Sequence, residues 1–223
     1  MTDSNAQRLN MVESQVRPSD VTDRRIIRAM LDVPREKFVP GALASTAYMD
    51  VDVPLQAETA PGAGRYLLAP RVLAKLIQAA GIEPGMTVLD VGCATGYATA
   101  IMATLAKTVV GLECDAGLAQ SAQKILTQLG VSNASVVQGP LDAGVVAQAP
   151  FDVILLDGAV AAVPAALAEQ LKEGGRIVGI RAEGYFGQAC VWTRVGKALD
   201  KRIVFDAGAH PLPGFQAKPQ FVF

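Results

Sequence analysis

The sequence predicts an α/β fold with a mainly parallel, doubly wound sheet. Short apolar, β-branched segments alternate with helical patterns between residues 69 and 180, as in sheets covered by helices on both faces. A glycine-containing turn follows the first of these strands, where ligands bind in open α/β sheets. The segments after residue 189 carry no helical pattern, which predicts antiparallel edge strands at the carboxyl end.

Composition narrows the class of protein. The 223 residues are 51% hydrophobic and 18% charged, with 20 Lys and Arg against 21 Asp and Glu. This balance excludes a disordered chain and disfavours a nucleic-acid partner, which calls for a basic surplus. The most apolar stretch, residues 151–171, is interrupted by charged residues and a proline, so no membrane span is expected.

Targeting signals and metal ligands are not evident. Residues 1–18 are polar and lack a secretory signal, and together with three scattered cysteines this predicts a cytoplasmic protein. Cys93, Cys114 and Cys190 form no paired motif, and His210 is the only histidine. We therefore expect no metal site. A Ser-His-Asp hydrolase is disfavoured as well, because no nucleophile-elbow motif accompanies His210.

Residues 1–65 form a first region, predicted to be a helical cap or substrate region. Asn5–Gln15 and Ser19–Leu31 show helical patterns, with Ser19, Asp20 and Asp23 as the start signal of the second helix. Two prolines bracket a short charged element at residues 33–40, and residues 49–64 form a loop rich in Asp, Pro and Gly. Residues 66–223 are expected to form the second, ligand-binding domain.

The second region alternates helix and strand in a regular order. Pro70 suits the first turn of a helix that ends at Gly81. The expected strands are residues 86–91, 108–112, 134–137, 151–156 and 176–180, and the expected helices are residues 97–106, 116–129 and 164–171. In the tail, residues 189–195, 201–205 and 221–223 are expected to add edge strands.

The turn after the first strand indicates the kind of ligand. Asp90 stands before Gly92 at the strand end, where it would repel a pyrophosphate but attract a ligand carrying an ammonium and a sulfonium. Glu113 ends the next strand, where an acid can accept both ribose hydroxyls of an adenosine. A further acid, Asp157, ends the fourth strand.

This pattern of DxGxxxG followed by an acid resembles the class I S-adenosylmethionine-dependent methyltransferases. The segment Val33-Pro34-Arg35-Glu36-Lys37-Phe38-Val39 is similar to the signature of the protein-L-isoaspartate O-methyltransferase family. The motif order that follows is also similar: Gly62–Gly64, Leu67–Pro70, the cofactor loop, Ala149–Ile154 and Leu171–Arg176. The similarity spans residues 5–215.

The resemblance implies a Rossmann-like, seven-stranded sheet with an N-terminal helical cap. It implies S-adenosyl-L-methionine as cofactor, S-adenosyl-L-homocysteine as product, and methylation of isoaspartyl carboxylates in damaged proteins. The implied cofactor-binding residues are Asp90, Gly92, Cys93, Ala94, Thr95, Gly96, Glu113, Cys114, Gly139, Pro140, Leu141, Asp142 and Asp157.

The substrate half of the site departs from the family pattern. The family's TIS(A/Q)P segment reads Tyr66-Leu67-Leu68-Ala69-Pro70 here, so Leu68 stands at the serine position. The family's glycine-aspartate pair is replaced by residues 138–142, so the adenine-side acid is either missing or displaced to Asp142. A carboxylate acceptor needs another donor than Leu68, and Arg71, Arg65 and Tyr66 are the candidates.

Several functions stay open on the sequence alone. The acceptor could be an isoaspartyl protein or peptide, or a small molecule in a pocket altered by Leu68. The chain could instead bind S-adenosylmethionine without turnover, as a regulatory protein, and a dehydrogenase is a distant fourth. His210 lies in a proline-bounded loop that could face the acceptor. We expect a monomer or a weak homo-oligomer, without nucleic-acid or membrane partners.

Overall fold

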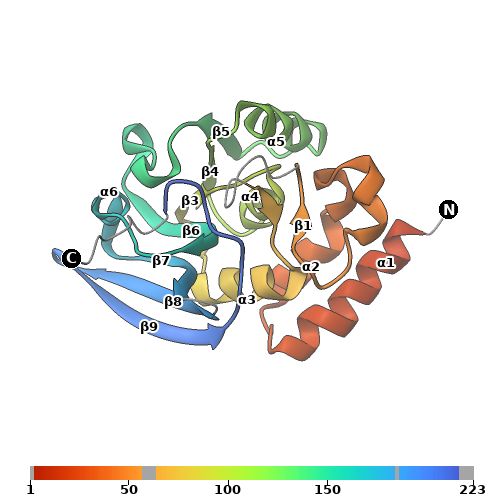
Figure 1. Ribbon diagram of the computed structural model, residues 1–223, viewed down its shortest axis with the longest axis horizontal. Helices are drawn as coiled ribbons and strands as arrows, with labels where there is room; N and C mark the ends of the chain where they lie inside the picture. Colours follow the sequence, from red (N-terminus) through yellow and green to blue (C-terminus); the bar gives the residue numbers. More distant parts are fainter. Residues whose placement is uncertain (1–2, 57–63, 184–185, 216–223) are drawn as a thin grey trace, which may run out of the picture.

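The computed structural model describes residues 3–56, 64–183 and 186–215, and within them a seven-stranded sheet forms the centre of the protein (Figure 1). Its order is β5-β4-β3-β6-β7-β8-β9; neighbouring strands run parallel from β5 to β7, and β8 and β9 are antiparallel. The bounds are β3 Thr87–Val91, β4 Thr108–Glu113, β5 Ala134–Gln138, β6 Phe151–Val160, β7 Leu171–Glu183, β8 Phe186–Val195 and β9 Ala198–Asp206. The predicted fold class is confirmed, including its antiparallel edge.

Alternation of side chains along β3 separates the two faces of the sheet. Val88 belongs to one hydrophobic cluster with α3 (Pro70–Ala80), α4 (Tyr97–Ala103) and α5 (Ala116–Gln128). Leu89 and Val91 point to the opposite face, where they join Leu167 of α6 (Ala165–Glu169), Leu141 of the 3-10 turn Leu141–Ala143, and Val145. The sheet is therefore covered on both sides, as the period-two apolar strands require.

The N-terminal region packs on the first of these clusters. It consists of α1 (Ser4–Met11), a π-helical turn (Val12–Val16), α2 (Arg24–Asp32) and 3-10 turns at Arg17–Ser19, Arg35–Phe38 and Gly41–Thr46. Buried residues of these elements, among them Met11, Ile26 and Phe38, belong to the same cluster as α3 and α4. Figure 1 shows α1 and α2, at the red end of the colour scale, next to α3.

Several predicted boundaries were wrong, for local reasons. The second helix begins at Arg24 and not at Ser19, because the Asp23 side chain accepts from the Arg25 amide over 2.8 Å, whereas Asp20 has a φ of 63°. Strands β6 and β7 extend further than expected because they pair again beyond a register irregularity, Ala159 with Ile180 and Val160 with Arg181, and because β7 pairs with β8 up to Glu183. Helix α6 is only five residues long and follows Pro164. The expected strand at 221–223 lies outside the described residues.

Three segments converge on the carboxyl ends of β3 and β6, where the order of the strands reverses. A two-stranded sheet, β1 (Val53–Pro54) with β2 (Tyr66–Leu67), comes from the chain that precedes α3. The chain after β9, deep blue in Figure 1, returns across β6 and forms a parallel bridge between Pro211 and Ala159. This reversal is where ligands bind in open α/β sheets. No helix in the described part of the chain is long and apolar enough to span a membrane.

Candidate functional site

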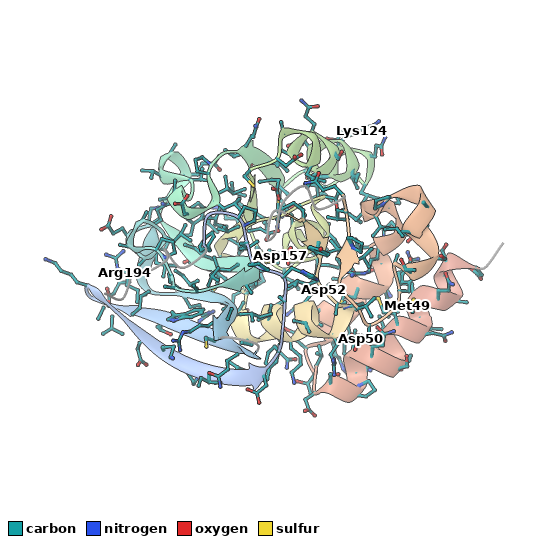
Figure 2. All side chains as sticks on the ribbon, viewed as in Figure 1. Met49, Asp50, Asp52, Lys124, Asp157 and Arg194 are labelled. Atoms are coloured by element: carbon teal, nitrogen blue, oxygen red, sulfur yellow. The ribbon has the colours of Figure 1, made fainter. Side chains whose placement is uncertain are left out.

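Three buried acids mark the carboxyl ends of adjacent strands. Asp90 lies in β3, Glu113 ends β4 and Asp157 lies in β6, and none is more than 2% exposed. The register places Asp90 beside Gly111 of β4 and Leu155 of β6, so the three carboxylates belong to one region. Figure 2 shows Asp157 near the middle of the molecule, at the carboxyl end of β6.

Asp90 is held on one side only. Its Oδ2 accepts a hydrogen bond from the Thr99 hydroxyl over 2.6 Å, while Oδ1 is buried without a partner in the described residues. Burial raises the pKa of Asp90 to about 7, against the lowering effect of the Thr99 hydrogen bond, and the nearby charge of Glu113 adds to the rise. A cation bound beside this carboxyl would favour its ionised form.

The carboxyl of Asp157 has fewer hydrogen bonds than that of Asp90. Both carboxyl oxygens are buried, and neither has a hydrogen-bond partner in the part of the chain that the structure describes. Burial raises the pKa of Asp157 well above its usual value, and the charge of Asp90 adds to the rise, whereas Arg65 and Arg35 act against it. A buried acid without donors is costly to fold, which is typical of a functional site.

The turn between β3 and α4 brings its backbone close to this region. Gly92, Ala94 and Gly96 have φ values of 80°, 51° and 91°, in the left-handed region that glycine enters without cost. The middle position therefore demands a conformation that costs Ala94 about 1–2 kcal/mol. Cys93 is fully buried, and Thr95 donates its hydroxyl hydrogen to the Phe38 carbonyl over 2.6 Å, which ties the turn to the N-terminal region.

Glu113 is fully engaged by the chain itself. Its Oε2 accepts from the Ala94 amide over 2.8 Å, and its Oε1 accepts from the amides of Cys114 and Asp115 over 2.9 and 3.1 Å. Arg65 forms a buried ion pair with it, Nη2 to Oε2, at 2.9 Å. Burial would raise the pKa of Glu113, but the charge and hydrogen bonds of Arg65 outweigh it and lower that pKa.

The segment after β9 covers the turn. The side chain of Leu212 is fully buried, and a Cβ placed on Gly92 or Gly158 would lie 2.6 or 2.7 Å from it. Nearby, the rings of Tyr66 and His210 stack, with centroids 3.5 Å apart and planes 6° from parallel. Leu212 and Arg65 therefore lie directly against the glycine turn, beside the three buried acids.

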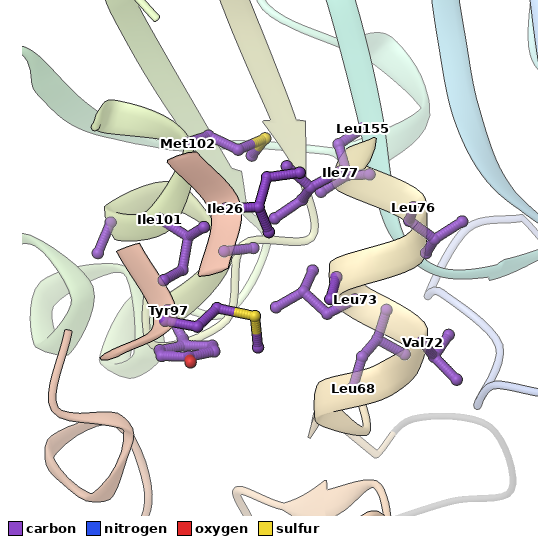
Figure 3. Packing of buried hydrophobic residues seen from close by; sticks show 14 of the residues in the cluster. Ile26, Leu68, Val72, Leu73, Leu76, Ile77, Tyr97, Ile101, Met102 and Leu155 are labelled. Atoms are coloured by element: carbon purple, nitrogen blue, oxygen red, sulfur yellow. The ribbon is translucent and has the colours of Figure 1, made fainter. Parts of the chain in front are cut away.

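Leu68 does not line an open pocket. Its side chain is 2% exposed and belongs to the hydrophobic cluster, and Figure 3 shows it at the beginning of α3. Its carbonyl accepts a hydrogen bond of 2.7 Å from Nη2 of Arg35, whose Nε donates to the Ala47 carbonyl over 2.6 Å. The segment that aligns with the family's substrate motif is thus fixed through its backbone.

The remaining site residues predicted from the sequence are Arg71 and residues 139–142, and they lie away from the three buried acids or at the edge of the region around them. The Arg71 side chain is 52% exposed and pairs with Asp50 at 3.1 Å. Gly139 follows β5 and donates its amide to the Glu113 carbonyl over 3.0 Å. Leu141 is buried, whereas Asp142 is exposed. The cofactor roles assigned to residues 139–142 stay predictions.

Sequence reasoning missed Thr99, Arg35 and Leu212 as parts of the site. Thr99 is nine residues after Asp90, within the first turn of the helix that follows the glycine loop, so a hydrogen bond back to the strand could have been expected. Arg35 is in the signature segment and is fully buried. No pattern in the sequence pointed to Leu212.

Comparison with known proteins identifies the family. The family model "Protein-L-isoaspartate(D-aspartate) O-methyltransferase" matches residues 6–201. The protein-L-isoaspartate O-methyltransferase of Koribacter versatilis is 40% identical over 171 residues, which cover 77% of this chain and 74% of that protein. The protein of the same name from Herpetosiphon aurantiacus is 34% identical over 208 residues, covering 93% and 90%.

Solved structures agree with this result. A protein-L-isoaspartate O-methyltransferase superposes with a TM-score of 0.80 at 25% identity over 93% of this chain and 66% of that chain. A Plasmodium falciparum protein, described as a putative member in complex with S-adenosyl-L-homocysteine, superposes with a TM-score of 0.75 at 20% identity, over 95% and 99%. The second structure, at 20% identity, supports only the assignment of the fold.

The residues present fit the family's cofactor, S-adenosylmethionine. Asp90 Oδ1 is a buried acceptor without a partner, suited to the positive charges of that molecule, and the left-handed turn at Gly92 lets a ligand approach the backbone. Glu113 ends β4, where an acid accepts ribose hydroxyls. On the family match and the sequence identities, the chain belongs to the protein-L-isoaspartate (D-aspartate) O-methyltransferase family.

Proposed function

We propose that this protein transfers a methyl group from S-adenosylmethionine to the carboxylate of isoaspartyl residues in damaged proteins and peptides. The observation that carries the proposal is the set of acids at three adjacent strand ends, Asp90, Glu113 and Asp157, in a chain of this family. The cofactor supplies a methyl group on a sulfonium. The acceptor oxygen forms the new O–CH3 bond while the S–CH3 bond breaks, and the electron pair stays on sulfur, leaving S-adenosylhomocysteine.

The chain's own residues have two tasks in this reaction. An acceptor carboxylate has a pKa near 4 and is already ionised at neutral pH, so no strong base is required. The protein must exclude water and hold the oxygen in line with the bond that breaks. Leu212, which is fully buried and lies against Gly92 and Gly158, serves the first task. The methyl ester then closes to a succinimide without help from the enzyme.

The test is methyl transfer to an isoaspartyl peptide. Purified protein and S-adenosylmethionine with a labelled methyl group are mixed with the peptide or with its normal aspartyl isomer. We expect a base-labile ester that releases labelled methanol from the isoaspartyl peptide alone, and loss of this activity in Asp90→Ala. Equal labelling of both peptides, or none under conditions where an active family member labels the isoaspartyl peptide, would contradict the proposal.

One observation favours a second candidate, a neutral acceptor. Both oxygens of Asp157 are buried without donors, and an ionised carboxylate there could take a proton from an O–H or N–H acceptor. A panel of hydroxyl and amine acceptors tests this. Activity on such an acceptor that Asp157→Asn abolishes would support the second candidate over the first. Binding of S-adenosylhomocysteine without methyl transfer to any acceptor would instead indicate a regulatory protein.

A further inference from the structure

Arg65 lies inside the cofactor half of the site. The residue is 3% exposed, and its guanidinium contacts two groups expected to face the cofactor. Nη2 lies 2.9 Å from Glu113 Oε2 and donates to the Gly92 carbonyl over 2.7 Å, while Nε lies 3.2 and 3.3 Å from the two Glu113 oxygens. A Cβ placed on Gly92 would lie only 2.9 Å from Nη2, so the guanidinium fills the space above the glycine turn.

Glu113 has no capacity left for a ribose while Arg65 is bound to it. A carboxylate offers about four acceptor sites, and here the amides of Ala94, Cys114 and Asp115 use three of them. The guanidinium takes the rest. Two ribose hydroxyls and Arg65 therefore compete for the same oxygens, and the cofactor can bind Glu113 only after Arg65 leaves.

The positive charges of the cofactor also favour the release of Arg65 from Glu113. The Arg65 guanidinium lies near Asp90, Glu113 and Asp157, and it acts on the pKa of all three. It compensates part of the negative charge of these three carboxylates. S-adenosylmethionine brings a sulfonium and an ammonium to the same acids, and two sets of cations in one desolvated cluster repel each other.

The side chain can leave without disturbing the backbone. The carbonyl of Arg65 accepts from the Leu55 amide over 2.9 Å, and the next residue, Tyr66, pairs with Pro54 in the two-stranded sheet. Tyr66 also stacks on His210 at the edge of the covered region. A long arginine side chain on an anchored backbone can turn from Glu113 towards an acceptor while the segment keeps its place.

We propose that Arg65 exchanges partners during the reaction cycle, binding Glu113 in the free protein and the acceptor carboxylate once the cofactor ribose takes Glu113. The proposal rests on the proposed function, since it requires a carboxylate acceptor. It provides a charged donor where Leu68 has no hydroxyl, and guanidinium–carboxylate pairs are among the strongest side-chain contacts. The cofactor then binds before the acceptor.

The experiment compares Arg65→Met with the wild type and with a control, Arg28→Met. The control also removes an arginine from an ion pair, but its pair with Asp32 is exposed. Affinity for S-adenosylhomocysteine is measured by calorimetry, without any acceptor. We expect Arg65→Met to bind it about tenfold more tightly, because the protein no longer has to break the pair with Glu113. At saturating S-adenosylmethionine, we expect the KM for an isoaspartyl peptide to rise about ten- to hundredfold, and Arg28→Met to match wild type.

The outcomes separate the two proposals. Weaker or unchanged binding of S-adenosylhomocysteine by Arg65→Met would show a structural ion pair and overturn the exchange, as would an unchanged KM for the peptide. Tighter binding with no peptide methylation by wild type would overturn the acceptor half of the exchange together with the proposed function. If Arg65→Met does not fold, Arg65→Lys applies the same criteria, because lysine keeps the charge but cannot bind both Glu113 and Gly92 through a planar fork.

Discussion

The hydroxyl of Thr99 donates to Oδ2 of Asp90 over 2.6 Å, from the first turn of α4 back to the end of β3. This contact orients the carboxyl and leaves Oδ1 without a partner among the described residues. A group held in this way binds a cation without first having to be reorganised, and its protonation state then controls the affinity.

Binding of S-adenosylmethionine should therefore strengthen as the pH rises through 7. Burial raises the pKa of Asp90 to about 7, and a cationic ligand favours the ionised form, so binding below pH 7 must release a proton. We expect the Kd to fall about tenfold between pH 6 and pH 8. Calorimetry measures it, and Asp90→Asn, which does not titrate, should lose most of this dependence. The same slope in both proteins would assign the titration to another group.

Asp157→Asn should change how stability depends on pH. The pKa of Asp157 is raised in the folded protein, so its contribution to stability is fully present below the unfolded pKa near 4 and is lost as the pH rises through the folded pKa. Asparagine does not titrate, and we expect the variant to gain about 1–3 kcal/mol relative to wild type at pH 8. Urea unfolding of the cofactor-free protein at pH 5 and 8 measures this. The exposed Asp200→Asn is the control, and parallel curves for Asp157→Asn and wild type would refute the expectation.

Restoring the family's serine should harm the protein. Leu68 is buried in the hydrophobic cluster, so Leu68→Ser leaves a cavity and buries a hydroxyl, at a cost of about 2–5 kcal/mol in unfolding free energy. We expect no gain in methyl transfer, because the side chain at position 68 points into the hydrophobic cluster and not towards the acceptor. Leu68→Met, which conserves volume, should cost less than about 1.5 kcal/mol. Faster methyl transfer by folded Leu68→Ser than by the wild type would show that the side chain at this position does reach the acceptor.

Arg35→Met should loosen the attachment of the substrate segment. The guanidinium donates to the carbonyls of Ala47 and Leu68 and lies 4.7 Å from the centre of the Tyr97 ring. Removing it leaves two buried carbonyls without a donor, and we expect a loss of about 2–4 kcal/mol in unfolding free energy. Urea unfolding of Arg35→Met and of the exposed control Arg28→Met measures the difference. Equal midpoints and slopes would mean that water replaces the guanidinium.

The fold could be predicted because its signals are local and periodic. Each strand of the parallel sheet is an apolar run that ends in a turn, and acids at strand ends fall on one edge of the sheet whatever the details of packing. The positions of Asp90, Glu113 and Asp157 at neighbouring strand ends could therefore be predicted from the sequence, whereas their roles towards the cofactor stay predictions. Their burial and neighbourhood in the structure follow from the parallel register.

The substrate half could not be predicted, because its contacts join distant parts of the chain. Arg65 meets Glu113 across 48 residues, and Arg35 meets Leu68 across 33. Residues 64–69 have no long periodic pattern. The sequence therefore does not predict which of their side chains point into the hydrophobic cluster and which point towards Asp90, Glu113 and Asp157. The exposed pair of Arg71 with Asp50 illustrates the same limit.

The stack of Tyr66 on His210 also has a practical consequence. His210 is the only histidine in the chain, so its imidazole protons give one pair of resonances in an NMR spectrum. The ring current of Tyr66, 3.5 Å away, shifts these resonances upfield for as long as the two segments stay in contact. The protein therefore carries its own spectroscopic probe of when the chain after β9 lifts from the strand ends, without any added label.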